Sequence, residues 1–407
     1  MFSQGWLLVG GLLLGLGLAV HSGGPFLVGA IVLLGAGASF LSHRYCLDRV
    51  EFRRTFTPRR AFYGEEITLT LEVTNRKPLP LAWLEVTDEL PEEIVPHRGR
   101  VIPSLRQRRW HLIHLFSLRW YERVRRRVTI ACKARGYFPL GPVRLRSGDL
   151  FGITSQGRTL EDIQHLLVYP KIVPLDALGI PALHPLGDYR APRPLLEDPT
   201  RTIGVRDYQT IDPIRRVHWK ATARMGRLQT RQYEATTTHR VAIHLNLDTL
   251  GEYAEYRGFI RPLLELNIMV AASVAAWATE EGLPVGLFAN GYLPEGLHRV
   301  RLAPALGEAH LTAILAALAK VFPTPVIPLG DLMALEAGAL PWGTTAVVVT
   351  AVIDPPLLAG IAFLRAAGHA VLLVLIGDSV EDPHLGIPTH RVKGEVGWRA
   401  MDEIRLI

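Results

Sequence analysis

Two apolar stretches open the chain, WLLVGGLLLGLGLAV at residues 6–20 and FLVGAIVLLGAGASFL at residues 26–41. No Asp, Glu, Lys or Arg occurs before Arg44, and a Gly- and Pro-containing turn at residues 21–25 separates the two stretches. A membrane span needs about 20 apolar residues, a length that each stretch reaches with its flanks. A secretory signal peptide needs a positively charged start, which this sequence lacks. The pattern therefore predicts a two-helix transmembrane hairpin over residues 1–43.

The residues around this hairpin predict its packing and its orientation. Gly11 and Gly15 form a GxxxG step, which allows close helix contact in lipid. The alternative is a buried helical hairpin of a soluble protein. Six arginines that follow directly after the second stretch argue against this alternative: Arg44, Arg49, Arg53, Arg54, Arg59 and Arg60. Because Lys and Arg close to a span stay in the cytoplasm, we expect the bulk of the chain to be cytoplasmic.

The composition excludes two broad classes of protein. The chain has 407 residues, of which 48% are hydrophobic and 20% charged, with a net charge of +7. This much apolar surface excludes intrinsic disorder. Two cysteines, Cys46 and Cys132, can form one bridge at most, which excludes a disulfide scaffold and agrees with a reducing cytoplasm. The length is typical of two or three domains.

After the hairpin the sequence alternates between apolar and polar residues, which is typical of strands with one buried face. The clearest example is Ile67–Val73, followed by the turn Asn75–Pro78 and a second strand at Leu81–Val86. Further candidates are Trp110–Leu118, Arg125–Cys132 and Val143–Leu145. Several short strands separated by Gly, Pro and Asn predict a β-sandwich domain of immunoglobulin-like type over residues 50–175.

A strongly basic segment lies inside this β-rich region. Ten arginines and one acid, Glu122, occur between Arg98 and Arg127, interleaved with Trp110, Trp120 and Tyr121. Arginines with aromatic residues suit nucleic acid. A basic face turned to anionic lipid headgroups, or simply to solvent, explains the same residues. Because a membrane hairpin precedes the segment, we favour lipid and expect no nucleic acid partner.

The next segment predicts a short helix. Asp212 suits the N-cap position, Pro213 the first helical position and Gly226 the C-terminal end. One face of this helix carries residues at helical spacing, namely Ile214, Val217, His218 and Ala221. The strand Leu228–Tyr233 follows.

The C-terminal part alternates between strands and helices. Predicted strands are Val241–Leu247, Pro284–Ala289, Thr345–Ile353 and Ala370–Ile376; predicted helices are Phe259–Glu281, Gly307–Val321 and Pro355–Ala367. This order predicts an α/β domain with a parallel sheet. Together with the short helix predicted to begin at Asp212, this domain occupies residues 195–407. Ligands of such sheets bind at the carboxyl ends of the strands, where Asp248 is expected.

Several motifs together resemble the bacterial family called "domain of unknown function 58". They are Arg135-Gly-Tyr-Phe-Pro-Leu-Gly-Pro142, Ser147-Gly-Asp-Leu-Phe-Gly152, Val168-Tyr-Pro170, Gly204-Val-Arg-Asp-Tyr208 and Asp212-Pro-Ile-Arg-Arg-Val-His-Trp-Lys-Ala-Thr-Ala-Arg224. One departure is Ile211, because the family usually has Gly before this aspartate. The resemblance implies a two-span anchor in the bacterial inner membrane, a β domain, and a cytoplasmic domain similar to von Willebrand factor A. It also implies partnership with AAA+ ATPases of the MoxR type.

The resemblance implies a magnesium site as well, which this sequence has altered. Related domains hold Mg²⁺ through Asp-x-Ser-x-Ser, a distant Thr and a further Asp. Here the first motif is Asp248-Thr-Leu-Gly-Glu252, and the later position is Thr350-Ala351. Asp248, Glu252 and Asp354 are the oxygen ligands left for a cation. We expect no cofactor, with the fold retained as an interaction surface and Asp248 as the residue of a degenerate metal site.

The expected function is that of a non-catalytic, membrane-anchored adaptor or scaffold for a MoxR-type ATPase in protein assembly or maturation. The candidate docking residues are Arg206, Tyr208, Asp212, Arg215, Arg216, His218, Trp219, Lys220 and Arg224. The same residues suit an internal salt-bridge network. Two alternatives stay open: a divalent-metal-dependent ligand-binding module, and a hydrolase using His218 with Asp207 or Asp212. The client protein and the oligomeric state do not follow from the sequence.

Overall fold

A computed structural model describes most of the chain. The described residues are 2–105, 108–149, 152, 154–180, 197–209, 212, 214, 217–235, 239–251, 259–294, 298–322, 324–341, 343–377 and 385–393. They form two compact units, Met1–Tyr169 and Pro170–Ile407. The division lies within six residues of the predicted end of the β domain at residue 175. Each unit is described below by itself.

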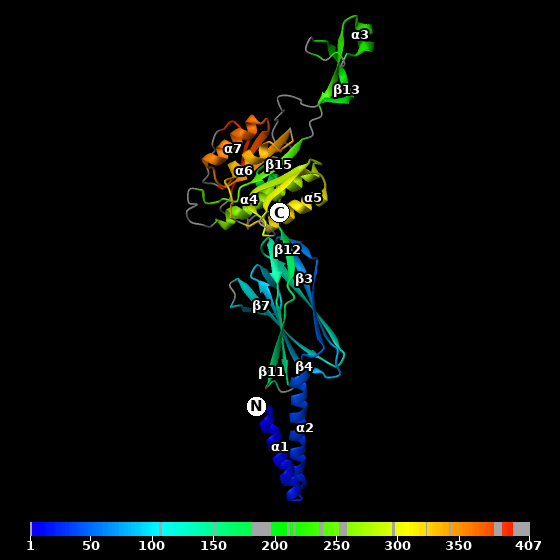
Figure 1. The fold of residues 1–407 in the computed structure, drawn as a ribbon, viewed down its shortest axis with the longest axis vertical. Helices are drawn as coiled ribbons and strands as arrows, with labels where there is room; N and C mark the ends of the chain where they lie inside the picture. The colour runs from blue at the N-terminus through cyan, green and yellow to red at the C-terminus, as the bar shows by residue number, and fades with distance from the viewer. Residues whose placement is uncertain are drawn as a thin grey trace. The chain divides into compact units, whose positions relative to one another are not determined.

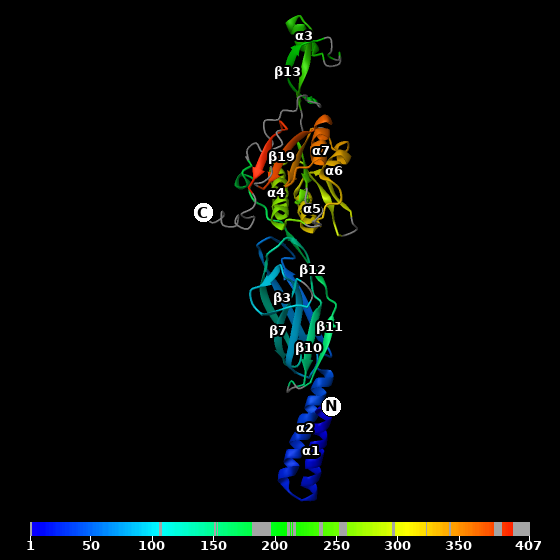
Figure 2. The same ribbon diagram turned by 90° about the vertical axis from the view of Figure 1, so that its left-hand side faces the viewer.

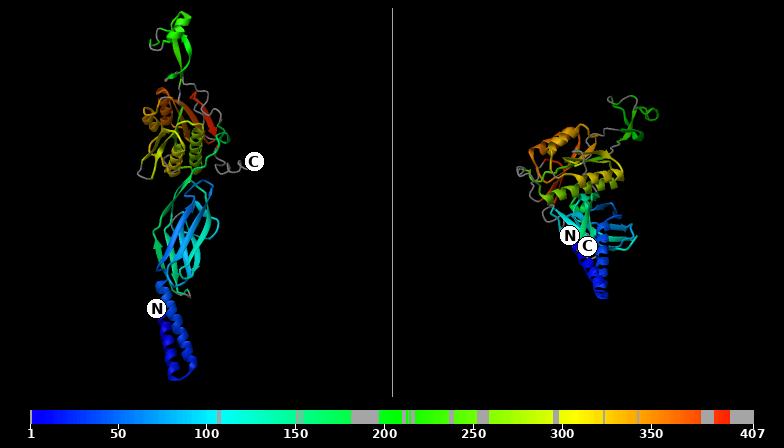
Figure 3. Two further views of the ribbon diagram at one scale, coloured as in Figure 1. Left: turned by 90° about the vertical axis from the view of Figure 1, so that its right-hand side faces the viewer. Right: turned by 60° about the horizontal axis from the view of Figure 1, so that its bottom comes forward.

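Two apolar helices begin the first unit, α1 (Phe2–Ala19) and α2 (Gly23–Tyr45). They lie side by side (Figure 3) and are joined by the short turn at residues 20–22. By length and composition α2 can span a membrane, whereas the apolar part of α1, Gly5–Ala19, is shorter than 18 residues. A third helix, Arg261–Glu280, meets the same criterion, but most of it is buried inside the second unit, as expected of a core helix.

The two helices meet at other glycines than the GxxxG step predicts. A Cβ atom on Gly11 or Gly15 would have no neighbour within 4 Å, so the predicted contact is wrong. A Cβ on Gly17 would lie 2.4 Å from the backbone nitrogen of Phe26, and one on Gly29 would lie 2.5 Å from that of Leu14. Both glycines let the two backbones approach closely, because they lie on the facing sides of α1 and α2.

The rest of the first unit is made of β-strands (Figure 1). One sheet has the order β1-β3-β8-β5, with β1 Val50–Thr57, β3 Glu66–Asn75, β8 Arg123–Cys132 and β5 Ile94–Pro96. A second has the order β11-β10-β4-β7-β6, with β11 Ser155–Leu160, β10 Val143–Gly148, β4 Leu81–Pro91, β7 Arg109–Leu118 and β6 Arg100–Pro103. A third contains β2 Arg60–Phe62, β12 Gln164–Tyr169 and β9 Gly136–Leu140.

The apolar residues of the alternating sequence pattern are the ones that are buried in the strands. In β3, Ile67, Leu69, Leu71 and Val73 are at most 1% exposed, and the threonines between them are half-buried. These side chains share one hydrophobic core with residues of β4, β7 and β8. The five predicted strands are confirmed, and each is extended by a few residues where backbone pairing continues past the apolar run.

The second unit contains a hairpin and an α/β domain. The hairpin pairs β13 (Glu197–Asp207) with β14 (Gln229–Ala235), and α3 (Trp219–Met225) lies between them in the chain. The domain has the sheet order β17-β16-β15-β18-β19-β20. Its strands are β15 Arg240–Leu245, β16 Val285–Tyr292, β17 Arg299–Ala305, β18 Thr344–Thr350, β19 Ala370–Ile376 and β20 Thr389–Val392. Its helices are α4 Arg261–Glu280, α5 Glu308–Lys320, α6 Leu329–Ala337 and α7 Pro355–Ala366, after the short 3₁₀ turn η1 Asp176–Leu178.

Helices cover both faces of this sheet (Figure 2). Residues of α6 and α7 share a buried core with β15, β18 and β19, while α4 contacts the same strands and α5 contacts β16 and β17. The predicted α/β alternation is confirmed, but the sheet is mixed, because β17 pairs antiparallel with β16. The elements β17, α6 and β20 were not predicted. In β17 the single buried apolar residue Val300 leaves too weak a pattern to identify a strand.

Candidate functional site

The segment with the family motifs folds into the β13–β14 hairpin and its helix. The two strands pair in register from Gly204 to Asp207, opposite Gln232 to Gln229. Val217 forms an isolated bridge to Thr230, so the chain before α3 lies along the second strand. Side chains also tie the hairpin together, since Gln229 donates to Asp207 at 2.6 Å. A small antiparallel hairpin thus presents α3 and the turn before it.

Asp212 organises that turn. Its Oδ1 accepts a hydrogen bond from Arg206 at 2.6 Å, and its Oδ2 accepts from the backbone N–H of Gln209 at 2.9 Å. The hydroxyl of Tyr208 donates to the Asp212 carbonyl at 3.0 Å. The bond from Arg206 and the one from Gln209 hold the pKa of Asp212 below its usual value. Three of the predicted residues, Arg206, Tyr208 and Asp212, therefore form one internal network.

His218 has a structural role at the start of α3. Its Nδ1 accepts the backbone N–H of Ala221 at 3.0 Å, so His218 is the N-cap. Asp212 and Pro213 were predicted to begin this helix, but α3 begins at Trp219, and the Asp212 carboxylate accepts from Arg206 and Gln209. Pro213 lies outside the described residues. The prediction for the helix end is confirmed: Gly226 has φ 67° and donates its N–H to Thr222 at 2.9 Å.

The hydrolase alternative requires an aspartate beside His218. Asp207 accepts from Gln229 and pairs with Arg227 at 3.2 Å, and Asp212 is held by Arg206. Within the described part of the hairpin, neither aspartate hydrogen-bonds to His218. The described contacts of His218 are those of a helix cap, whereas nucleophilic catalysis uses a histidine oriented by a carboxylate.

The outer side of the hairpin exposes large apolar side chains. Ile214 is 71% exposed, Trp219 65%, Met225 57% and Leu228 47%. No residue of α3 is buried. Lys220 and Arg224 are also exposed, and they make no ion pair among the described residues. Arg215 and Arg216, the remaining predicted docking residues, lie outside the described residues.

The second candidate site is the carboxyl edge of the α/β sheet, where a network of amides and hydroxyls is buried. Asn246 donates to the Thr350 hydroxyl at 3.0 Å and accepts at its Oδ1 from the Asn290 amide at 2.9 Å. The Asn267 amide donates to the Asn246 carbonyl at 3.0 Å. All four side chains are at most 2% exposed. They link β15, α4, β16 and β18.

Asp248 lies just outside this network. Its Oδ1 accepts the N–H groups of Leu250 at 2.9 Å and Gly251 at 3.3 Å, which makes it a turn residue. Asp354 accepts the N–H of Leu357 at 2.8 Å and is the N-cap of α7. Glu252 lies outside the described residues.

Mg²⁺ requires open hard oxygens in octahedral array, and the described residues offer few of them here. The oxygens of Asn246 and Thr350 and one oxygen of Asp248 already accept N–H groups. No group of three His, Cys, Asp or Glu suited to a metal occurs in the part of the chain that the structure describes. The binding of a cation at Asp248 stays a prediction.

The amide network was not predicted, although the sequence contains a signal for it. Asn246, Asn267 and Asn290 each lie in an otherwise apolar run, namely the strand end at β15, the core of α4 and the strand β16. A buried polar side chain requires hydrogen-bond partners. Three amides in three elements predicted to be buried could therefore have been paired with one another.

The fold so far comprises N-terminal apolar helices, a β domain and a mixed α/β domain that follows a motif-bearing hairpin. Residues 204–387, somewhat less than half of the chain, match the family model described as "Protein of unknown function DUF58", which supports the family resemblance of the motifs. The match begins within β13 and includes the hairpin, α3 and most of the α/β domain. No curated protein matches the chain.

Solved structures show only weak likeness. A cohesin module of a family 33 glycoside hydrolase from Clostridium perfringens is 9% identical with a TM-score of 0.20, over 30% of this chain and 95% of that chain. A β-glucosidase from Listeria innocua is 9% identical with a TM-score of 0.18, over 29% and 16%. The sporulation control protein of Bacillus subtilis is 14% identical with a TM-score of 0.19, over 33% and 56%. Scores this low carry no argument about fold or function.

Proposed function

We propose that this protein is a non-catalytic, membrane-anchored scaffold that docks an AAA+ ATPase of the MoxR type through the β13–β14 hairpin. In this proposal α1 and α2 form a two-span anchor in the bacterial inner membrane, and the rest of the chain is cytoplasmic. The partner class comes from the family resemblance of the motifs, and the docking surface comes from the exposed side chains of the hairpin.

The observation that carries the docking proposal is the exposed apolar group Ile214, Trp219, Met225 and Leu228. Several exposed large apolar side chains on one small element commonly mark a protein–protein interface. Trp and Arg dominate the binding energy of such interfaces, and here Trp219 begins α3 next to Lys220, with Arg224 five residues further along the helix. The surface suits a partner with an apolar pocket and acidic residues around it.

The internal network of Asp212 supports a rigid docking element. The bonds from Arg206, Tyr208 and Gln209 fix the turn before α3, so less conformational entropy is lost when a partner binds. Six of the predicted docking residues thus divide into two groups. Arg206, Tyr208 and Asp212 hold the turn, while Trp219, Lys220 and Arg224 face outward.

We further propose that the β domain is of immunoglobulin-like sandwich type and the α/β domain is related to von Willebrand factor A. Two sheets sharing one core support the first relation. Helices on both faces of a largely parallel sheet support the second. The engaged oxygens at the sheet edge favour a scaffold over a metal-dependent ligand-binding module.

Site-specific crosslinking tests the docking surface. We place a photo-crosslinking amino acid at Leu228, which is exposed and follows α3, in the full chain in native bacterial membranes. Mass spectrometry then identifies the crosslinked chain. The expected product joins the protein to a MoxR-type AAA+ ATPase. Crosslinks only to lipid or to a second copy of this chain would contradict the proposal.

A matched pair of variants measures the contribution of Trp219. Removal of a central aromatic anchor typically costs 2 kcal/mol or more, so W219A is expected to weaken ATPase binding by roughly 30-fold. Phe363 on α7 is 52% exposed and serves as the control, since F363A removes an exposed aromatic ring outside the hairpin. Equal binding by W219A and F363A would exclude the hairpin as the docking site.

A further inference from the structure

The end of α2 is fixed to the β domain. The Ser39 hydroxyl donates to the Asp149 carboxylate at 3.0 Å, one and a half helical turns before α2 ends. Beyond the helix, the buried Lys77 ammonium donates to the carbonyls of Cys46 at 2.7 Å and Asp48 at 2.8 Å. The turn between β3 and β4 that carries Lys77 therefore lies directly against the residues that follow α2.

The loop between β7 and β8 is tied to the same place. Tyr121 donates its N–H to the Lys77 carbonyl, and Asn75 donates its side-chain amide to the Arg119 carbonyl at 2.9 Å. Two aromatic side chains of this loop face solvent, with Trp120 65% and Tyr121 67% exposed. Such exposure of neighbouring large aromatics at one tip requires an explanation.

The position of α2 sets the depth of this loop. If α2 spans the bilayer, Ser39 and its partner Asp149 mark the edge of the hydrocarbon core, because a carboxylate is costly within hydrocarbon even when protein covers it, as here. Cys46 lies seven residues further, about 10 Å along a helix. The headgroup layer is roughly 5–8 Å thick on each side, and Trp and Tyr rings concentrate there. The backbone of the loop beside Cys46 thus lies just outside this layer, at a distance that a Trp or Tyr side chain can bridge.

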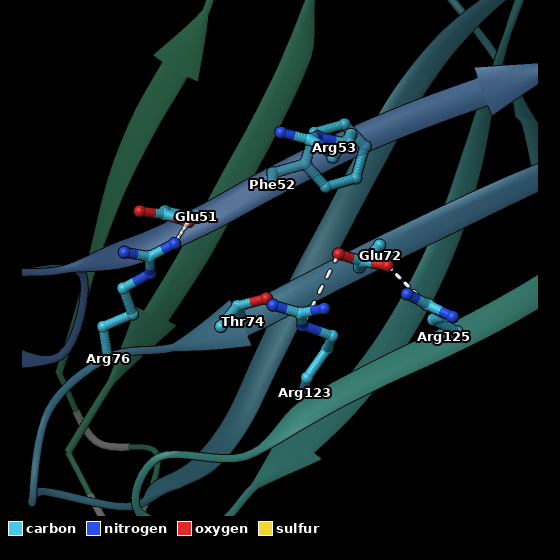
Figure 4. A pocket seen from close by; sticks show the side chains of 8 residues that line it. All are labelled: Glu51, Phe52, Arg53, Glu72, Thr74, Arg76, Arg123 and Arg125. Carbon is cyan, nitrogen blue, oxygen red and sulfur yellow. Dashed lines mark hydrogen bonds and ion pairs between the residues drawn. The ribbon is translucent and has the colours of Figure 1, made fainter.

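A basic groove begins at the same end of the β domain (Figure 4). It encloses about 500 Å³ and is lined by Glu51, Phe52, Arg53, Glu72, Thr74, Arg76, Arg123 and Arg125. Thr74 pairs with both Glu51 and Arg123 at the strand ends next to Lys77. Four guanidinium groups face two carboxylates, so the groove carries an excess of positive charge even with the Arg76–Glu51 pair at 2.9 Å.

We propose that this end of the β domain is a second membrane contact, in which Trp120 and Tyr121 lie among the headgroups and the groove arginines bind phosphates of anionic lipids. The inference rests on α2 spanning the membrane, as proposed above, and is independent of the ATPase partner. The aromatic rings supply the interfacial preference, and each arginine near an anionic surface contributes about 1 kcal/mol. The contact fixes the β domain against the membrane.

Tryptophan quenching in nanodiscs tests this contact. The full chain is placed in discs of anionic lipid, a fraction of which carries a nitroxide on the headgroup. The fraction of tryptophan emission that is quenched is compared between the natural sequence and three Trp→Phe variants. W120F reports the loop and W6F reports α1. W110F is the control, because Trp110 lies eight residues from Leu118 along β7, about 27 Å from the loop.

The expected results separate the two proposals. W6F lowers the quenched fraction if the helices are in the bilayer, and no change with W6F contradicts the anchor itself. Trp83 donates to the Asp149 carbonyl at 3.1 Å, so it also lies near the headgroups. If Trp6, Trp83 and Trp120 contribute most of the quenching among the eight tryptophans, W120F lowers the fraction by roughly a third. W110F raises it slightly, because it removes an unquenched ring. An effect of W120F no different from that of W110F overturns the membrane contact while leaving the anchor intact.

A second pair of measurements tests the groove. In discs of zwitterionic lipid, or in the variant R76Q/R123Q in anionic discs, we expect the Trp120 contribution to quenching to fall at least twofold. Both arginines are more than half exposed, so these changes leave the core of the β domain unaltered. Quenching of Trp120 that is the same in both lipids and in both proteins contradicts the role of the arginines.

Discussion

A buried ion pair in the β domain gives a sharp prediction about its stability. Arg54 of β1 and Asp88 of β4 have fully buried side chains, with Nη1 and Oδ1 2.5 Å apart. Arg54 also donates through Nη2 to the carbonyls of Leu140 at 2.8 Å and Asp162 at 2.7 Å. Within the described residues, Oδ2 of Asp88 has no hydrogen-bond partner. Asp88 therefore depends more on the ion pair than Arg54 does.

Removal of one partner leaves the other charge buried, which typically costs 3–5 kcal/mol. We expect R54M to reach the upper part of this range, because Asp88 then loses the arginine that pairs with it. D88N is expected near the lower part, because Arg54 keeps two carbonyl acceptors. The double variant R54M/D88L removes both charges and fills the space, so its stability should lie within about 1 kcal/mol of the natural protein.

The cost of R54M should depend on pH. Burial raises the pKa of Asp88 to about 6, and Arg54 opposes the rise. Folded protein thus binds this proton more tightly than unfolded protein, in which the pKa is near 3.8. The associated stability is present below the unfolded pKa and is lost as the pH rises through about 6. Without Arg54 the pKa rises further, so R54M should regain up to about 1.4 kcal/mol per pH unit between pH 7.5 and 5.5.

Thiol labelling in urea measures this one domain within the full chain. Cys132 in β8 is fully buried, and burial raises the pKa of its thiol to about 12, so it reacts only after unfolding. Pulsed alkylation followed by peptide mass spectrometry gives the labelled fraction at each urea concentration. A loss of 3–5 kcal/mol lowers the midpoint by roughly 2 M for an ordinary urea dependence. Equal, pH-independent losses in R54M and D88N, with no recovery in the double variant, would refute the reasoning.

Two further predictions concern the second unit. H218A should speed hydrogen exchange in α3 several-fold and weaken partner docking, while H218N keeps a capping acceptor and both properties; loss of function in H218N with α3 intact would point to catalysis instead. His244 of β15 is fully buried against Phe288, and burial lowers its pKa to about 3. The stability it contributes is present above pH 6.5 and lost at lower pH, so pulse proteolysis of the α/β domain at pH 7 and pH 5 should differ by about 2 kcal/mol in urea stability. H244F should abolish most of that difference, and an unchanged difference would assign it to other groups.

The sequence predicted those elements whose hydrophobic period is unambiguous. The strict alternation in Ile67–Val73 and the long apolar run that became α4 each permit one assignment. The hairpin of α1 and α2 was predicted for the same reason, since few structures other than an apolar helix suit an uncharged apolar run of that length. The contact between α1 and α2 was not predicted correctly. A GxxxG spacing identifies small residues, but which face of the helix meets its partner depends on the tertiary arrangement.

The predicted start of α3 differs from the observed one for a related reason. Asp followed by Pro is a good helix start by local rules, and Asp212 meets them. The residue that decides the outcome is Arg206 on β13, which reaches the Asp212 carboxylate only because the hairpin brings the two together. Capping by His218 then begins the helix six residues later. Rules for helix capping consider only neighbouring residues in the sequence, so they could not include the hydrogen bond from Arg206 on a neighbouring strand.

The two candidate sites differ in what their polar groups leave available. At the sheet edge, a ligand would have to displace hydrogen bonds among Asn246, Asn290 and Thr350, each worth about 1 kcal/mol when kept and more when broken in a buried site. On the hairpin, the polar network of Asp212 holds a turn and occupies no outward-facing group. Trp219 and its basic neighbours can therefore bind a partner without disrupting any internal bond. On energetic grounds the edge at which α/β sheets usually bind ligands is the less favourable surface, which is why the proposal assigns recognition to the hairpin.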